Sequence, residues 1–294
     1  TVEEIMAELD RMVGLSEIKE NVLTLINHIK TQQRLIAEGF EADEISLHSV
    51  FFGPPGTGKT TVARLIGRIY KAIGLLPKGQ VIEVSRANLV AEFVGQTGPK
   101  TNAVIDSALH GILFIDEAYS LASSKGSNDF GHEAIEELLK RMEDDRDKFA
   151  VIVAGYTAEM QTFISSNTGL ESRFSNYFFF PDFTAVDLTE IFRRMVIRKR
   201  FDIDPDALAS VEEFLTRLYN ERSASFGNGR MVRNFYEKLT KSHSNRVAGL
   251  PNATRQELIT FNQEDVINAI KIFITMIPRT HQTADERRPI GYRN

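Results

Sequence analysis

The stretch that most constrains the fold is residues 53–60, which read Gly-Pro-Pro-Gly-Thr-Gly-Lys-Thr. They fit the pattern G-x-x-x-x-G-K-[ST] of the phosphate-binding P-loop. Glycines are needed there because the backbone curls around a phosphate with its N–H groups pointing inward, where a Cβ would obstruct it. Residues 48–52 predict a strand before the loop and residues 61–66 the start of a helix after it. This context favours a P-loop over a glycine-rich turn that merely joins strand to helix.

A second stretch supplies the carboxylates that a P-loop needs. Residues 111–117 read Gly-Ile-Leu-Phe-Ile-Asp-Glu, four apolar residues followed by two acidic ones. This pattern predicts a buried parallel strand that delivers Asp116 and Glu117 to its C-terminal edge, where α/β sheets bind their ligands. Lys59 would reach the β- and γ-phosphates of a nucleotide, Thr60 and Asp116 would hold Mg²⁺, and Glu117 would polarise the attacking water. The alternative is a strand that ends in surface carboxylates without function.

The order of patterns along the chain predicts an α/β fold with a second, helical part. Strand and helix patterns alternate up to about residue 180, which predicts a three-layer αβα domain with a parallel sheet over residues 1–183. Helical patterns alone follow over residues 184–276, and Thr184 and Asp187 resemble a capping box at their start. The polar residues 277–294 have little to bury, so we expect them to be disordered.

Composition excludes several classes of function. The 294 residues include no cysteine, which rules out disulfides and thiolate metal sites, and the six histidines show no ligand spacing. Any metal is therefore expected to arrive with the nucleotide. The net charge of -5 disfavours a general nucleic-acid binder. No apolar run approaches the length of a membrane span, so we expect a soluble cytoplasmic protein with no membrane partner.

Four stretches together resemble AAA+ ATPases. They are residues 53–64, 111–119, 154–156 and 227–234, in that order. They are similar to the subgroup that contains the red-type Rubisco activase CbbX, the stage V sporulation protein K and the EccA ATPase of type VII secretion. The resemblance covers residues 1–276. It implies a P-loop NTPase domain, a helical lid, ATP and Mg²⁺ as cofactors, and self-association into a ring, usually a hexamer.

The resemblance also implies roles for individual residues. Residues 13–15 would line the adenine pocket, and Arg173 would be the arginine finger that enters the neighbouring subunit's site, worth about 10³–10⁵ in rate. Arg230 would be the lid arginine at the γ-phosphate, with Arg233 as the runner-up. An exposed helix charge is the alternative for both arginines. The nucleotide contacts implied are Val13, Gly14, Pro54, Pro55, Gly56, Thr57, Gly58, Lys59, Thr60, Thr61 and Arg230.

Two further positions bear on mechanism. Phe93, Val94 and Gly95 fall where the family places its central pore loop, an apolar grip on a polypeptide; an ordinary core aromatic is the alternative. Many AAA+ proteins carry asparagine at the tip of the fourth strand, whereas here Tyr156 and Thr157 follow Gly155. Which hydroxyl, if either, takes that role stays open.

Three functions compete at this point. The leading hypothesis is an ATP-driven ring that remodels a protein client or threads it through the pore. A nucleic-acid motor or loader is the second, and its support is a basic cluster on one helix: Arg193, Arg194, Arg198, Lys199 and Arg200. The third is a nucleotide-switched scaffold that hydrolyses little, against which the intact catalytic set argues. The shared motifs belong to the motor and do not identify the client.

Overall fold

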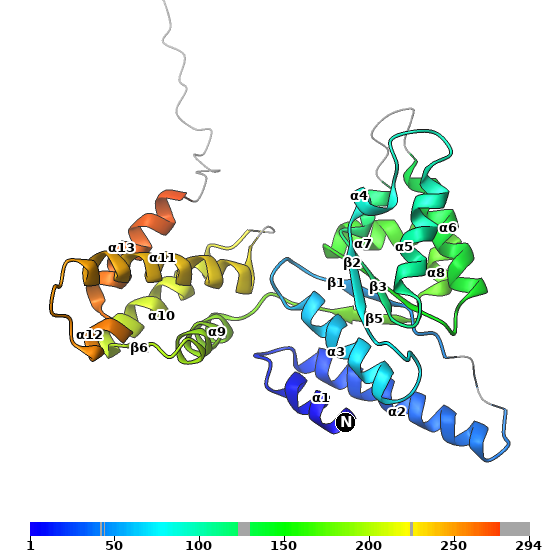
Figure 1. Ribbon diagram of the computed structural model, residues 1–294, viewed down its shortest axis with the longest axis horizontal. Helices are drawn as coiled ribbons and strands as arrows, with labels where there is room; N and C mark the ends of the chain where they lie inside the picture. Colours follow the sequence, from blue (N-terminus) through cyan, green and yellow to red (C-terminus); the bar gives the residue numbers. More distant parts are fainter. Residues whose placement is uncertain (42, 44, 123–129, 224–225, 277–294) are drawn as a thin grey trace, which may run out of the picture. The chain divides into compact units, whose positions relative to one another are not determined.

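A five-stranded parallel sheet forms the centre of the first of two structural units (Figure 1). The computed structural model describes residues 1–41, 43, 45–122, 130–223 and 226–276. The first unit comprises residues 1–191 and 218–232, and the second residues 192–217 together with the chain from 233. The sheet has the order β2-β3-β4-β1-β5. Its strands are β1 Ser49–Phe52, β2 Val81–Val84, β3 Ile112–Asp116, β4 Ala150–Gly155 and β5 Asn176–Phe179.

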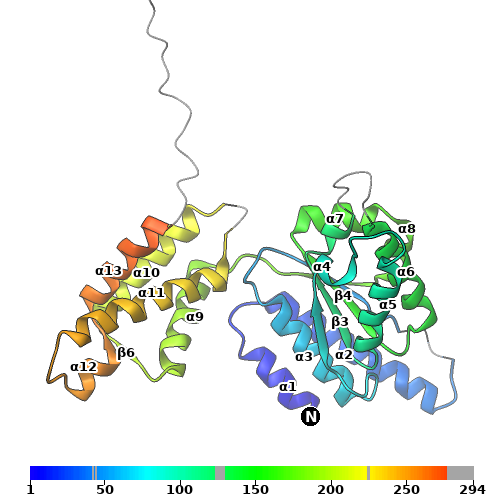
Figure 2. The same cartoon turned by 45° about the horizontal axis from the view of Figure 1, so that its top comes forward.

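Helices cover both faces of this sheet, which confirms the predicted three-layer architecture. One face carries α1 Val2–Asp10, α2 Ser16–Ala37 and α3 Lys59–Ala72 (Figures 1 and 2). The other carries α5 Thr97–Ala108, α6 Gly131–Asp144, α7 Thr157–Ser165 and α8 Thr168–Arg173. The short helices α4 Arg86–Leu89 and η1 Ala118–Leu121 follow β2 and β3.

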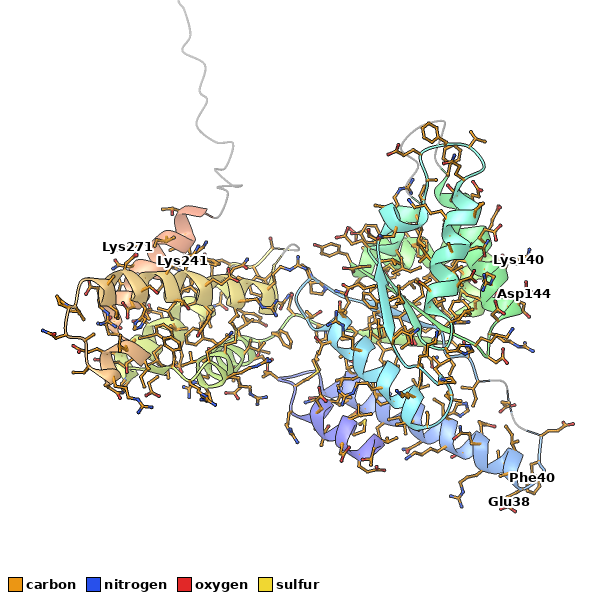
Figure 3. All side chains as sticks on the ribbon, viewed as in Figure 1. Glu38, Phe40, Lys140, Asp144, Lys241 and Lys271 are labelled. Carbon is orange, nitrogen blue, oxygen red and sulfur yellow. The ribbon has the colours of Figure 1, made fainter. Side chains whose placement is uncertain are left out.

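The strands are apolar because both of their faces are covered. Val50, Leu113 and Val151 pack among the helices on the α5–α8 side. Phe51 and Phe114 are equally buried, and the ring of Phe51 contacts those of Phe114, Phe178 and Phe180. A sheet buried on both faces produces continuous hydrophobic runs rather than alternation, as the sequence patterns predicted. Side chains fill the layers on both faces (Figure 3).

The second unit is helical, with an aromatic core. Its elements are α9 Ala185–Arg198, α10 Pro205–Asn220, α11 Asn228–Ala248, α12 Arg255–Ile259 and α13 Gln263–Met276. The rings of Phe192, Phe214, Phe235 and Phe273 contact one another, at centroid separations of 5.1 to 6.0 Å. A parallel pairing of β6 Asp202–Ile203 with β7 Thr260–Phe261 is added to the predicted helices. Helices α9, α10 and α11 each pass from one unit into the other.

Local capping signals were mostly correct, with one exception. Thr184 and Asp187 form the predicted capping box of α9, and Asn262 accepts the backbone N–H of Asp265 at the start of α13. Ser16, whose residue type is typical of an N-cap, is instead the first helical residue of α2, and Leu15, whose side chain cannot accept a hydrogen bond, takes the cap position with φ 61°. The ammonium of Lys19 fixes this turn by donating to the carbonyls of Asp10 and Met12.

Within the described ranges, no helix combines the length and the apolarity that a bilayer span demands. The tail predicted to be disordered, residues 277–294, lies outside the described residues.

Candidate functional site

The P-loop connects β1 to α3 and owes its shape to its glycines. Gly53, Gly56 and Gly58 all have positive φ, at 146°, 74° and 97°. Gly53 donates its N–H to the carbonyl of Gly155, so the loop begins by extending the pairing of β1 with β4. The hydroxyl of Thr57 closes the turn by donating to the carbonyl of Pro54 at 2.9 Å. Pro54, Gly56, Thr57 and Gly58 were predicted to contact the nucleotide, and the structure places them in this one loop.

Lys59 is the first residue of α3, and its ammonium is largely withdrawn from solvent. Its Nζ donates to the carbonyls of Gly53 and Pro54 at 2.8 and 2.7 Å. Burial lowers the pKa of Lys59 to about 8, with Arg230 adding repulsion and Asp116 opposing the shift. Any anion held in the loop would favour the charged amine, as expected for a lysine that binds phosphates.

Asp116 and Glu117 reach the same edge of the sheet as the P-loop. Asp116 ends β3 and is paired in register with Ala154 of β4, which neighbours β1. Glu117 has φ 50°, unusual for a residue with a side chain, and its N–H donates to Oδ1 of Asp116 at 3.1 Å. This left-handed turn separates the two carboxylates, one on the strand end and one on the following turn.

A magnesium ion fits these residues only together with a nucleotide. Among the described residues, no group of three or more histidine, cysteine or acidic side chains could hold a metal. Mg²⁺ commonly takes one or two protein oxygens, with waters and phosphate oxygens completing its octahedron. The hydroxyl of Thr60, which follows the P-loop lysine, and the carboxylate of Asp116 are donors of that kind.

The predicted adenine-pocket turn lies directly against the P-loop. A Cβ on Gly58 would come within 3.2 Å of Met12 and 3.8 Å of Leu15. On the other side of this turn, a Cβ on Gly14 would stand 3.4 Å from the side chains of Phe183 and Asp187. Val13 and Gly14 are therefore held between the phosphate loop and the chain segment that leads into α9.

Asn228 is a site residue that the sequence analysis missed. It is fully buried with φ 47°; its Oδ1 accepts the N–H of Phe183 at 2.8 Å, and its Nδ2 donates to Asp182 at 2.7 Å. The next residue, Gly229, donates its N–H to the carbonyl of Gly56 at 3.1 Å. These bonds fasten the start of α11 to the P-loop and place Arg230 beside it. The available signal was an asparagine between two glycines at a helix start, a pattern typical of a left-handed residue.

Arg173 lies near the ends at which β1 and β5 begin, whereas the P-loop follows the end of β1. Arg173 ends α8, its carbonyl accepts the hydroxyl of Ser46, and β5 begins three residues later beside the first residue of β1. A four-residue strand of about 13 Å therefore separates Arg173 from the phosphate-binding edge. Its guanidinium pairs with Glu143 of α6 at 3.0 Å, and its buried Nε has no hydrogen-bond partner in the part of the chain that the structure describes. Arg173 is not brought together with the other predicted catalytic residues of its own chain.

The candidate pore loop is exposed. Phe93 and Val94, between α4 and α5, are 65% and 80% exposed, and no atom of the described residues lies within 4 Å of where a Cβ on Gly95 would stand. The interpretation of Phe93 as a core aromatic is therefore wrong. The N–H of Ala91 donates to the hydroxyl of Thr97, which fixes the two ends of the loop relative to each other.

Two tyrosines flank the end of β4. Tyr156 is the N-cap residue of α7, and its ring lies 6.4 Å from that of Tyr119, centroid to centroid. Burial, and then the charge of Glu117, raises the pKa of Tyr119 to about 12, so its phenol stays protonated. Gly155 is required here because a Cβ would come within 2.7 Å of the Tyr119 ring. Tyr156 and Thr157 were candidates from the sequence, whereas Tyr119, two residues after Glu117, was not.

Comparison with known proteins assigns the family. Residues 49–182 match the ATPase family associated with various cellular activities (AAA), and residues 184–272 match the AAA lid domain. Over 266 residues the chain is 40% identical to stage V sporulation protein K of Bacillus subtilis, covering 90% of this chain and 82% of that protein. The chain belongs to the AAA ATPase family. Membership implies ATP hydrolysis, and the resemblance to this subgroup is confirmed.

Other relatives of this AAA ATPase differ in their named roles. The chain is 36% identical to the chloroplastic ribulose bisphosphate carboxylase/oxygenase activase of Cyanidioschyzon merolae, over 91% of this chain and 92% of that one. It is 39% identical to the ESX-3 secretion system protein EccA3 of Mycobacterium tuberculosis, of which it spans 44%. The RuvB Holliday junction branch migration motor of Thermotoga maritima has a TM-score of 0.58, covering 90% of this chain and 71% of that one. At 19% identity, this last likeness shows the fold alone.

Proposed function

We propose that this AAA ATPase assembles into a ring, usually of six subunits, and uses Mg²⁺-dependent ATP hydrolysis to remodel a protein client or thread it through a central pore. The position of Arg173 carries the proposal. The P-loop, Asp116 and Glu117 lie at the C-terminal ends of the parallel strands, and Arg173, the candidate arginine finger, lies at their N-terminal ends. A subunit needs a neighbour to complete its site, and a closed ring supplies one to every subunit.

The residues divide the chemistry among them. Lys59 and the N–H groups of the P-loop bind the phosphates, and Glu117 polarises the water that attacks the γ-phosphate. Arg230 in cis and Arg173 in trans stabilise the negative charge that spreads over the transferred phosphoryl group. Mg²⁺, held by Thr60, Asp116 and the phosphates, would supply further positive charge.

The exposed Phe93 loop supports a polypeptide client. An aromatic and an aliphatic side chain on a glycine-containing loop make contacts that are apolar and non-directional, so they suit many sequences. The named relatives serve sporulation, secretion and carbon fixation, which is consistent with one motor acting on different clients.

The nucleic-acid alternative is weakened because its basic cluster does not form one free face. Arg193 pairs with Glu212 of α10, and Arg194 also interacts within the protein. Arg200 lies beyond the end of α9 in a left-handed conformation. Among the described residues, Arg198, Lys199 and Arg200 have no side-chain hydrogen bond or ion pair, and of these three only Arg198 lies within α9.

A subunit-mixing experiment tests the shared site. Arg173→Ala and Glu117→Gln subunits should each be nearly inactive alone, whereas their mixture should regain ATPase activity at interfaces that combine an intact Glu117 with an intact Arg173. The ATPase rate per subunit is followed against protein concentration, with particle mass measured in parallel. A rate that stays constant from a persistent monomer would overturn the ring and favour a nucleotide-switched scaffold.

A further inference from the structure

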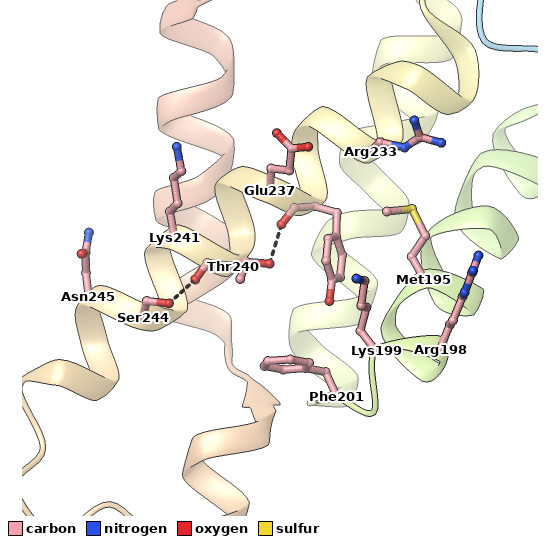
Figure 4. A pocket seen from close by; sticks show the side chains of 11 residues that line it. Met195, Arg198, Lys199, Phe201, Arg233, Glu237, Thr240, Lys241, Ser244 and Asn245 are labelled. Carbon is pink, nitrogen blue, oxygen red and sulfur yellow. Dashed lines mark hydrogen bonds between the residues drawn. The ribbon is translucent and has the colours of Figure 1, made fainter.

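A groove in the second unit is not used by the proposed motor. It lies between α9 and α11, with a volume of about 950 Å³ (Figure 4). Its apolar part is formed by Met195, Phe201 and Tyr236, of which Tyr236 is 7% exposed and the others half-buried. Such a hollow offers apolar surface to a ligand that can bury it.

Cations surround this apolar floor. Arg198 ends α9 and Lys199 follows it, Arg233 and Lys241 approach from α11, and among the described residues Glu237 is the one carboxylate that lines the groove. Among the described residues, none of these four cations has a side-chain hydrogen bond or an ion pair. By contrast, Arg193 on α9 is neutralised by an ion pair with Glu212 of α10. The groove therefore concentrates positive charge that no ion pair among the described residues neutralises.

The spacing of the cations selects among anionic ligands. Arg233 and Lys241 are eight residues apart on α11, which corresponds to about 12 Å along the helix, so a single phosphate or carboxylate would have to draw both side chains towards each other across Glu237 to contact both. Glu237 stands midway on the same helix face and would repel a continuous line of phosphates. The ligand should instead carry separated negative charges with apolar groups between them.

We propose that this groove docks an acidic segment of a protein partner. From Arg233 to Asn245 the groove extends about 18 Å, enough for five or six extended residues. Leucine-like side chains of the segment would cover Met195 and Phe201, and its carboxylates would face the cations of α9 and α11. The groove would thus add recognition, in a part of the chain separate from the nucleotide site and from Phe93.

Fluorescence anisotropy of the full chain with a labelled pool of acidic-apolar peptides, about six residues long to match the groove, tests the proposal. The Arg198→Glu, Lys241→Glu double variant should weaken binding at least tenfold, because it places carboxylates against carboxylates. Lys271→Glu is the control: Lys271 is an exposed lysine on α13, labelled in Figure 3, and it is not one of the residues that line the groove. It should bind within about twofold of the native chain, and added salt should weaken binding.

The docking site would be overturned if the pool did not bind, if lysine-substituted peptides bound equally well, if inorganic phosphate displaced the peptides, or if an oligonucleotide were preferred. Loss of binding on ATP-driven assembly would also do so, by assigning the groove to a second copy of the chain. The ATPase rate is measured separately from peptide binding. If the peptides do not bind but the ATPase rate is intact, only the docking site is rejected. Peptide binding by a chain without cooperative ATPase activity would reject only the motor.

Discussion

At the residue scale, the buried ammonium of Lys59 links nucleotide binding to pH. Its pKa of about 8 reflects burial in the P-loop, and the phosphates of ATP would raise it again. Below pH 8 the amine is charged both with and without nucleotide. Above pH 8 it must take up a proton on binding, so the affinity for ATP should fall as the pH rises through 8.

Titration calorimetry at pH 8 in buffers of different ionisation enthalpy measures this uptake, which we expect to be about half a proton per site. Lys59→Arg is the control, because a guanidinium stays charged throughout this range. A binding heat that does not change with the buffer in the native chain would contradict the assignment.

Glu143 provides a second test at this scale, because it holds Arg173 in the isolated chain. The pair is partly solvent-exposed, so it contributes less than about 1 kcal/mol. If Arg173 must leave Glu143 to enter a neighbouring site, Glu143→Gln should lower the protein concentration needed for ATPase activity, by up to about fivefold. The measurement is the rate per subunit against concentration; an unchanged or raised midpoint would argue that the pair does not restrain the finger.

At the element scale, sequence patterns correctly predicted the helices and strands that depend on residues close together in the chain. The strand before the P-loop, the helix after it and the acidic end of β3 follow from apolar runs and motif spacing, and all occur as expected. The β6–β7 pairing was missed because two residues are too few to show a period. The Asn228 network and the Glu143 pair were missed for another reason: they join residues far apart in the chain, and no local pattern records such contacts.

The side chain of His48 connects two strands, β1 and β4, at the end of the sheet where both strands begin. His48 precedes β1, and its Nδ1 accepts the N–H of Val151 in β4 at 3.0 Å. Burial lowers its pKa to about 4, against about 6.5 in the unfolded chain. The unfolded state therefore binds more protons between these values, and the free energy of unfolding should fall, by up to about 3 kcal/mol, as the pH drops from 6.5 towards 4.

Urea unfolding at pH 7 and pH 5 measures this loss. His48→Gln should be less stable at pH 7 but should show a smaller fall between the two pH values, since glutamine does not titrate. An equal fall in both proteins would assign the acid sensitivity to other groups.

At the scale of the whole molecule, the proposed division of labour predicts that ATP hydrolysis and client handling separate on mutation. Phe93→Ala should keep the basal ATPase rate, because the loop is distant in sequence from the catalytic motifs, and should lose stimulation by a permanently unfolded polypeptide. Phe40→Ala is the matched control: Phe40 is 66% exposed and Phe93 65% exposed, and Figure 3 shows Phe40 beyond the far end of α2. Equal stimulation of both variants would remove the pore-loop role.

The contact between Gly56 and the start of α11 changes how P-loop variants should be interpreted. A Cβ on Gly56 would stand 2.2 Å from the carbonyl of Gly227 and 2.8 Å from the backbone nitrogen of Arg230. A loss of activity in Gly56→Ala would therefore report a displaced helix as much as a damaged phosphate cradle. Selection at this position acts on two requirements at once, and a glycine retained there in relatives is no proof that nucleotide binding survives in them.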